Sequence, residues 1–382
     1  MPLTATRGLG AAASSYRVDV DLTFRETAGT PARITKLKVD IFAPSGWSNA
    51  TAYDTNLAIA ALGAANQTLT TVVNVEGSTE SVRWRLATTV TDPDGQAFNV
   101  TPVELDLRFV TTAPTPVPDE VFVGAGDIAK CGVGDPEATA KLLDRIPGTV
   151  FTLGDNAQSN GFAEEYTHCY DPTWGRHKWR TFPTVGNHDW DATAGGPYFA
   201  YFGANAGPPG PGYYSYTLGS WHIVSLNSNV AGGPGSPQYE WLKADLAASP
   251  ATCTLAMWHH PLFTSGPNGN TGRMRDIWRL LNQAGADMVL NGHDHVYERF
   301  TPQDADGRPT PRGMREFIVG TGGYSLYDRA SSQPNSEIFE NRTWGVLKLT
   351  LKSGKYDWEF VPVAGKSFRD FGSAACVAPS TP

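Results

Sequence analysis

Five stretches of this chain place histidine, aspartate or asparagine directly after a short apolar run. In chain order they are Gly126-Asp127, Gly154-Asp155-Asn156, Gly186-Asn187-His188-Asp189, His259-His260-Pro261 and Gly292-His293-Asp294-His295. Neutral imidazole nitrogens and carboxylate oxygens are donors that proteins offer to divalent and trivalent metal ions. Alone, the Gly-His-x-His stretch is a moderate signal, but five such stretches in one chain predict a metal site.

The elements that carry the first two stretches are predicted to lie side by side. Residues 121–123 and 149–153 read as apolar strands, and residues 136–146 read as a helix between them. Such a strand-helix-strand unit makes the two strands parallel and puts Asp127 and Asp155 at one carboxyl edge. Two neighbouring aspartates repel one another unless a cation lies between them, which again favours a metal.

The other three stretches also follow predicted strands, at residues 181–185, 252–258 and 288–290. Further strands are expected at 213–216, 222–226 and 316–319, a hairpin at 345–351 and 355–361, and helices at 238–247 and 272–284. This alternation predicts an α/β domain of mixed β-sheets sandwiched by helices. Every candidate ligand falls at the carboxyl end of a strand, where open α/β sheets place their sites.

The first part of the chain has a different pattern. The chain has 382 residues, which favours two domains. Residues 16–24 and 103–109 alternate apolar and polar side chains, as strands with one buried face do. Several such strands predict an immunoglobulin-like or fibronectin III-like sandwich over residues 1–112. A proline-rich linker at residues 113–119 then leads to the second domain, residues 120–382.

Composition and charge exclude some classes of function. A net charge of −8 argues against nucleic-acid binding, and the absence of an 18-residue apolar run predicts no membrane span. Residues 1–15 show no signal peptide, so a secreted, extracellular or periplasmic protein would have its signal outside this sequence. The sequence does not indicate an oligomeric state.

Four cysteines, an even number without Cys-x-x-Cys spacing, favour two disulfides and an oxidising compartment. Their positions suggest pairing Cys131 with Cys169 and Cys253 with Cys376, although the sequence alone does not fix the pairing. Buried free thiols in a cytosolic enzyme are the alternative.

The ordered set of five stretches resembles the metallophosphoesterase superfamily, and its arrangement is most similar to the purple acid phosphatase-like branch. The resemblance covers about residues 120–365, and a preceding β-sandwich is also similar to that branch. It implies two metal ions that share one aspartate. One ion would be held by Asp127, Asp155 and His295, and the other by Asp155, Asn187, His259 and His293.

The resemblance also implies a second role for Asn187 and roles for two further side chains, and it shows one departure. His188 is similar to the family's catalytic histidine, Asn187 would neutralise charge on the phosphate, and His260 would lie beside the ligands. The purple branch carries a tyrosine where this chain has Gln158, which leaves Gln158 as a weak ligand or as space for water. We therefore expect divalent zinc, manganese or iron rather than an iron(III)-tyrosinate centre.

The predicted function is hydrolysis of a small phosphate ester by a metal-bridging hydroxide, with a phosphomonoesterase of the acid-phosphatase type as first choice. A phosphodiesterase or nucleotide hydrolase with the same metal centre is the second reading. A surface-binding protein with a decayed site is the non-enzyme alternative, and Gln158 is the only residue that favours it.

Overall fold

The computed structural model describes residues 118–377 except residue 192, together with seven strands between residues 6 and 108. Contacts divide the chain into two units, Met1–Pro116 and Val117–Pro382. In the first unit, antiparallel pairing joins the strands into sheets of order β1-β2-β5 and β4-β3-β6-β7. The strands are β1 (Thr6–Arg7), β2 (Ser15–Arg25), β3 (Ala32–Ala43), β4 (Gly46–Ile59), β5 (Ala64–Asn74), β6 (Ser81–Thr91) and β7 (Ala97–Arg108). Most of the predicted linker, residues 113–117, lies outside the described residues.

A six-stranded mixed sheet in the second unit carries the first three predicted ligand stretches. Its order is β12 (Thr181–Thr184), β10 (Thr149–Leu153), β8 (Glu120–Ala125), β20 (Gly345–Lys352), β21 (Lys355–Pro362) and β22 (Phe371–Ala375). β8, β10 and β12 are parallel, as the strand-helix-strand prediction requires. Between β8 and β10 lies α1 (Pro136–Leu143), whose first turn is capped by the Asp135 carboxylate at 3.0 Å from Ala138 N. The helix ends at Leu143, three residues before the predicted end.

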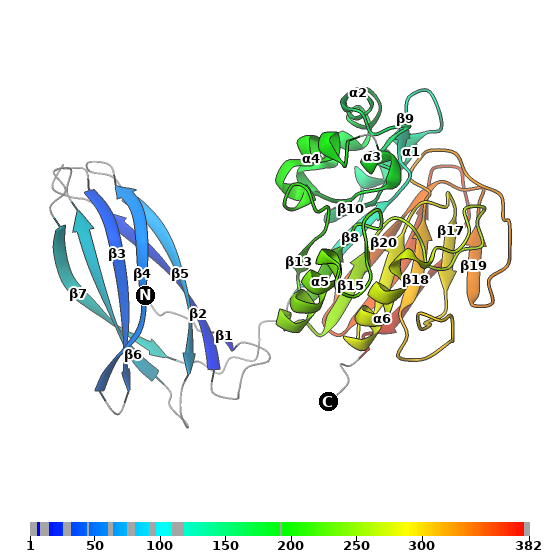
Figure 1. Ribbon diagram of the computed structural model, residues 1–382. Helices are drawn as coiled ribbons and strands as arrows, with labels where there is room; N and C mark the ends of the chain where they lie inside the picture. The colour runs from blue at the N-terminus through cyan, green and yellow to red at the C-terminus, as the bar shows by residue number, and fades with distance from the viewer. Residues whose placement is uncertain are drawn as a thin grey trace. The chain divides into compact units, whose positions relative to one another are not determined.

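A second, seven-stranded sheet carries the histidine stretches. Its order is β13 (Tyr214–Leu218), β14 (Trp221–Ser225), β15 (Cys253–Met257), β16 (Met288–Asn291), β18 (Arg315–Val319), β17 (Tyr297–Phe300) and β19 (Ser336–Glu340). Helices α5 (Pro237–Ala248) and α6 (Arg275–Gln283) lie next to one another along one face of this sheet (Figure 1). The predicted helix at 272–284 is confirmed, with a 3-10 first turn at Gly272–Met274.

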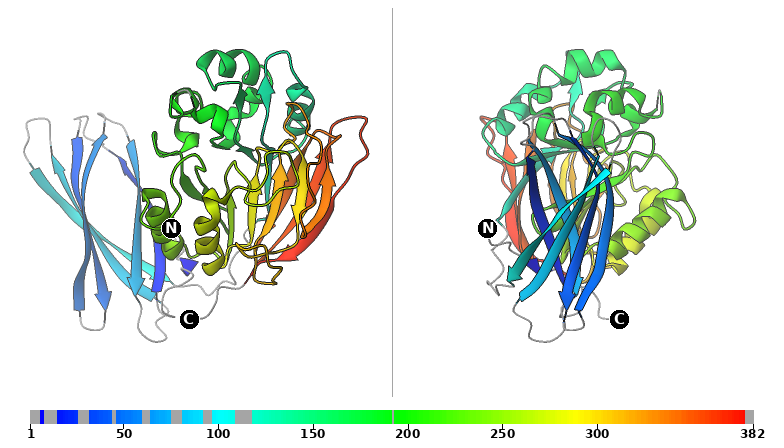
Figure 2. Two further views of the ribbon diagram at one scale, coloured as in Figure 1. Left: turned by 45° about the vertical axis from the view of Figure 1, so that its right-hand side comes forward. Right: turned by 90° about the vertical axis from the view of Figure 1, so that its left-hand side faces the viewer.

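The core of this unit lies between the two sheets. Tyr297 of β17 packs on Phe360 of β21 with ring centroids 4.6 Å apart, and Phe317 of β18 packs on Trp358 at 5.8 Å. A second apolar cluster, which includes Trp258 and Trp278, joins α5 and α6 to the other face of the seven-stranded sheet. The left view of Figure 2 shows the two helices along that face. Aromatic pairs of this kind bury large apolar areas and fix the sheets against each other. The positions of the strand ends at the site therefore rest on a rigid core.

Short elements surround the carboxyl ends of β8, β10 and β12 (Figure 1). They are β9 (Ala129–Lys130), β11 (Ala157–Gln158), α2 (Ala163–Glu165), the π-helical turn η1 (Tyr166–Tyr170), η2 (Trp174–Arg180), α3 (Asn187–Trp190), α4 (Gly196–Phe202) and η3 (Gly203–Ala206). The disulfide Cys131–Cys169 joins the residue after β9 to η1, and Cys253–Cys376 joins the start of β15 to the chain after β22. Both suggested pairings are confirmed. No helix among the described residues is long and apolar enough to cross a membrane.

Candidate metal centre

The structure brings all six predicted ligands together, from the carboxyl ends of five strands. Asp127, Asp155 and Asn187 follow β8, β10 and β12, whereas His259 follows β15 and both His293 and His295 follow β16. The sheets are joined at this edge by a hydrogen bond from the His259 Nδ1–H to the Leu153 carbonyl, 2.7 Å long. The two sheets thus contribute to one site.

Asp127 and His295 form one half of the site. His295 Nε2 lies 3.3 Å from Asp127 Oδ1, and both side chains are buried. The Nδ1–H of His295 donates to the Ser325 carbonyl at 2.8 Å, which leaves Nε2 free to act as a lone-pair donor. Asp127 Oδ2 accepts from the His293 backbone N–H at 2.9 Å, but Oδ1 has no hydrogen-bond partner among the described residues. A buried, unpartnered carboxylate oxygen beside a free imidazole nitrogen fits a cation.

Asp155, Asn187, His259 and His293 form the other half. His259 Nε2 lies 3.3 Å from Asp155 Oδ2, 3.1 Å from Asn187 Oδ1 and 3.3 Å from His293 Nδ1. Asp155, His259 and His293 each offer one possible ligand atom, and these three atoms all lie within 4.8 Å of one another. Because the Nδ1–H of His259 is held by the Leu153 carbonyl, Nε2 is the ring nitrogen that faces these oxygens, and it is the atom that would bind a metal ion. The donor set therefore suits a second cation.

The carboxylate of Asp155 favours positive charge in this half of the site. Burial alone would lower the pKa of His259, but the charge of Asp155 outweighs it and raises that pKa to about 9. Burial would likewise raise the pKa of Asp155, and His259 outweighs it and lowers that pKa. Burial and the charge of His259 lower the pKa of His293 to about 4. A positive charge is required between these groups, and a metal ion would supply it in place of the proton.

The backbone at the site is held in unusual conformations. Asp127, Asp155 and His293 have φ angles of 58°, 50° and 70°, in the left-handed region that side chains seldom adopt. A Cβ added to Gly186 would lie 2.1 Å from Asp155 Oδ1, and one added to Gly292 would lie 2.7 Å from Asp127 Oδ2. These two glycines are required because the backbone runs against the carboxylates.

His188 and His260 border the ligands. The Nδ1–H of His188 donates to the Ser159 carbonyl at 2.6 Å, and its Nε2 lies 3.8 Å from Asp155 Oδ2. Its side chain is 38% exposed, so it can reach a substrate. His260 Nδ1 lies 2.7 Å from Ser228 Oγ, and its ring centroid lies 4.4 Å from that of His293. Burial and the charges of His259 and His293 lower the pKa of His260 to about 2, so this ring is neutral.

Comparison with known proteins gives the family. Residues 121–297 match the family model described as Calcineurin-like phosphoesterase, and this range contains all six clustered side chains. The second unit therefore contains a calcineurin-like phosphoesterase region, residues 121–297.

Relatives of this chain include purple acid phosphatases of Arabidopsis thaliana. Purple acid phosphatase 15 is 26% identical over 253 residues, which cover 56% of this chain and 46% of that protein. Purple acid phosphatase 21 is 28% identical over 277 residues, which cover 65% of this chain and 61% of that protein. The chain thus spans less than two thirds of the length of either relative. Purple acid phosphatase PPD1 from yellow lupin shares the fold, with a TM-score of 0.60, 16% identity, and coverage of 98% of this chain and 74% of that one.

Gln158 lies in β11, which pairs with β9, and its side chain is buried. Its Nε2 has no hydrogen-bond partner in the described part of the chain. Gln158 lines a cavity of about 250 Å³, whose other walls are Lys130, Ser159, Glu164, Glu165, His168 and the Cys131–Cys169 disulfide.

Sequence reasoning missed two aromatic side chains next to His295. The ring of Tyr327 stacks on His295 with centroids 3.9 Å apart, and the ring of Tyr324 lies 5.1 Å away. Burial and the charge of Asp127 raise the pKa of Tyr327 to about 12, so this phenol is neutral. Both tyrosines come from a loop without a ligand-type motif, and no spacing in the sequence connects that loop to His295.

Proposed function

We propose that this phosphoesterase hydrolyses phosphate monoesters with two divalent metal ions. The observation that carries the proposal is the convergence of carboxylate oxygens and free imidazole nitrogens in two adjoining groups. Asp127 and His295 would hold one ion, Asn187, His259 and His293 the other, and Asp155 would be shared. Two ions bound there would supply an activated water and neutralise charge on the phosphate.

The flanking side chains would then bind the ester and move a proton. His188 is fixed through its Nδ1–H and its side chain is partly exposed, so Nε2 is the atom that would protonate the leaving oxygen or contact a phosphate oxygen. The Oγ of Ser228 accepts from the His260 backbone N–H at 3.1 Å, and its hydroxyl proton can therefore donate to His260 Nδ1. His260 would then present a neutral Nε2–H as a hydrogen-bond donor.

The first unit and the location of the protein belong to the same proposal. We propose that β1–β7 form an immunoglobulin-like or fibronectin III-like sandwich over residues 1–112, joined by residues 113–119 to a catalytic domain at 120–382. The paired strands of two sheets support this arrangement. We also propose secretion or export, which the two disulfides support because they persist in oxidising compartments.

Metal analysis joined to paired substrates tests this function. Protein purified without chelator should contain about two ions per chain and should hydrolyse an aryl phosphomonoester faster than the matched diester. His188→Ala should lose most activity on esters with poor leaving groups, whereas His168→Ala, an exposed histidine outside the ligand set, should retain it. A protein that binds no metal, and stays inactive with added zinc, manganese or iron, would contradict the proposal. Faster diester hydrolysis would favour the phosphodiesterase reading.

A further inference from the structure

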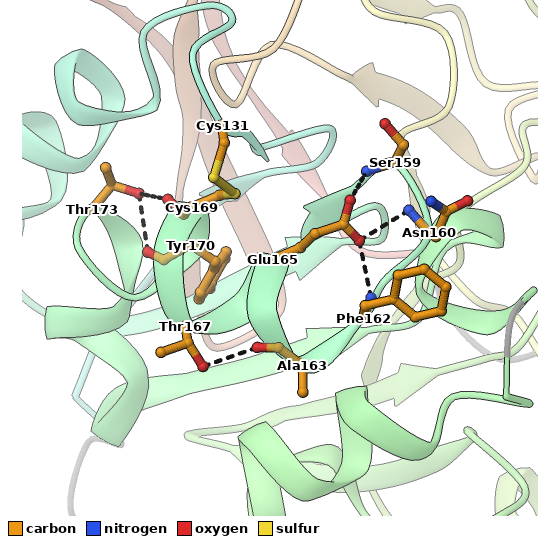
Figure 3. The surroundings of a disulfide bond; sticks show 10 residues. All are labelled: Cys131, Ser159, Asn160, Phe162, Ala163, Glu165, Thr167, Cys169, Tyr170 and Thr173. Carbon is orange, nitrogen blue, oxygen red and sulfur yellow. Dashed lines mark hydrogen bonds between the residues drawn. A yellow bond between two sulfur atoms is a disulfide. The ribbon is translucent and has the colours of Figure 1, made fainter.

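Glu165 holds three backbone N–H groups of the loop between β11 and α2. Its carboxylate accepts hydrogen bonds from Ser159 N, from Asn160 N at 3.0 Å and from Phe162 N at 2.9 Å. Figure 3 shows this carboxylate pointing from α2 into the loop, with all three bonds drawn. Hydrogen bonds to a carboxylate are stronger than those between neutral groups, so these three bonds stabilise this conformation of the loop.

One of these bonds fixes the carbonyl that orients His188. Asn160 N–H and the Ser159 carbonyl belong to the same planar peptide group, and in such a group the two point in opposite directions. Because the N–H faces Glu165, the carbonyl faces away from it, and it accepts the Nδ1–H of His188 at 2.6 Å. A peptide whose N–H donates to a carboxylate is polarised, and its carbonyl becomes a better acceptor.

We propose that Glu165 is a positioning residue that acts on His188 through the Ser159–Asn160 peptide. The carboxylate, the peptide and the imidazole form a continuous chain of hydrogen bonds. This chain holds the ring so that Nε2 faces Asp155 and the substrate. The arrangement does the work of a carboxylate bonded directly to a catalytic histidine, with a peptide group between them.

A simpler role for Glu165 is capping of α2, since Phe162 is the residue before the first turn of that helix. Capping alone accounts for the bond to Phe162 N but not for the bonds to Ser159 N and Asn160 N. A capping residue affects stability and acts equally on all substrates. A residue that positions His188 affects most strongly those substrates whose leaving group needs a proton.

The test compares Glu165→Ala and Glu165→Gln with Glu164→Ala, an exposed neighbour on the same helix turn. The proposal rests on the function assigned to His188, so the substrates are phosphomonoesters of p-nitrophenol, phenol and an alkyl alcohol. In Glu165→Ala, kcat should fall roughly 10- to 100-fold for phenyl and alkyl esters and much less for the p-nitrophenyl ester. Glu165→Gln keeps an acceptor oxygen and should recover much of the loss, and Glu164→Ala should match the unmutated protein.

Two further measurements separate this role from a structural one. Adding Glu165→Ala to His188→Ala should cause no further loss of kcat, because both changes remove the same oriented group. In the zinc-loaded protein, long-range proton-nitrogen NMR should show the His188 proton on Nδ1, and Glu165→Ala should yield a mixture of tautomers. An equal loss on all three esters, additive losses in the double variant or an unchanged tautomer would overturn the inference. If the protein hydrolyses no ester but the tautomer still changes, the proposed function fails and the positioning role stands.

Discussion

The two disulfides should differ in what their removal does to the protein. Cys253–Cys376 closes a loop of 123 residues and Cys131–Cys169 a loop of 38. If each bond acts by restricting the unfolded chain, its loss costs about 5 kcal/mol for the longer loop and about 4 kcal/mol for the shorter one. The two loops do not overlap in the sequence, so the two losses should add.

Their effects on activity should run in the opposite order. Cys253 begins β15, six residues before His259, which places it about 20 Å from the site along the strand. Cys169 lies in η1, four residues after Glu165, and its partner Cys131 follows β9, which pairs with β11 next to Ser159. Loss of the shorter bond should therefore disturb the loop that orients His188.

Paired serine variants test both orders. Urea denaturation of Cys253→Ser/Cys376→Ser should show the larger fall in free energy of unfolding, while its kcat stays within about two-fold of the unmutated value, since its bond is remote from the site. Cys131→Ser/Cys169→Ser should lose less stability and more activity, most of all on poor leaving groups. If the long-loop variant loses more activity, or the short-loop variant loses more stability, the reasoning is wrong.

Three further predictions concern the metal centre and the sheet behind it. Asp155→Ala should remove both metal ions together, because one carboxylate serves two ions, and elemental analysis that finds two ions retained would contradict the shared role. Gln158→Tyr should favour iron(III) at the Asp127 and His295 half, and visible absorption should appear after iron loading of a protein that is otherwise colourless. Burial raises the pKa of Asp287 to about 7, so its neutral form stabilises the fold below pH 4, and this stability is lost as the pH rises to 7. In urea denaturation, the free energy of unfolding of the unmutated protein should fall as the pH rises from 4 to 8. In Asp287→Asn this fall should be smaller by up to about 4 kcal/mol. A fall of unchanged size would count against a raised pKa.

Much of the second unit could be predicted because its strands are short apolar runs that end in polar motifs. β10 matches its predicted residues, and β8 and β15 differ only at their ends. α1 ends early because its last predicted residues, up to Ile146, form a turn outside the helix. In the first unit, the packing of the two sheets into a sandwich stays a prediction.

At the site, the clustering of the six ligand-type side chains could be predicted from the sequence. Each of them follows a strand, and the carboxyl ends of parallel strands meet at one edge of a sheet. Their roles as metal ligands stay a proposal. Tyr327, Ser325 and Glu165 could not be found from the sequence because each acts from a loop or a short turn. Their contacts with His295 and with the Ser159–Asn160 peptide depend on where these loops lie in the folded chain. Periodic patterns in the sequence do not indicate the position of a loop.

The left-handed backbone of Asp127, Asp155 and His293 has a consequence for engineering. Strain of this kind costs on the order of 1 kcal/mol or more at each residue, and glycine would relieve it. A screen that selects only for resistance to heat would therefore enrich glycine at the three positions where a side chain matters most for metal binding. Among variants of this protein, a gain in melting temperature at these positions should therefore come with weaker metal binding.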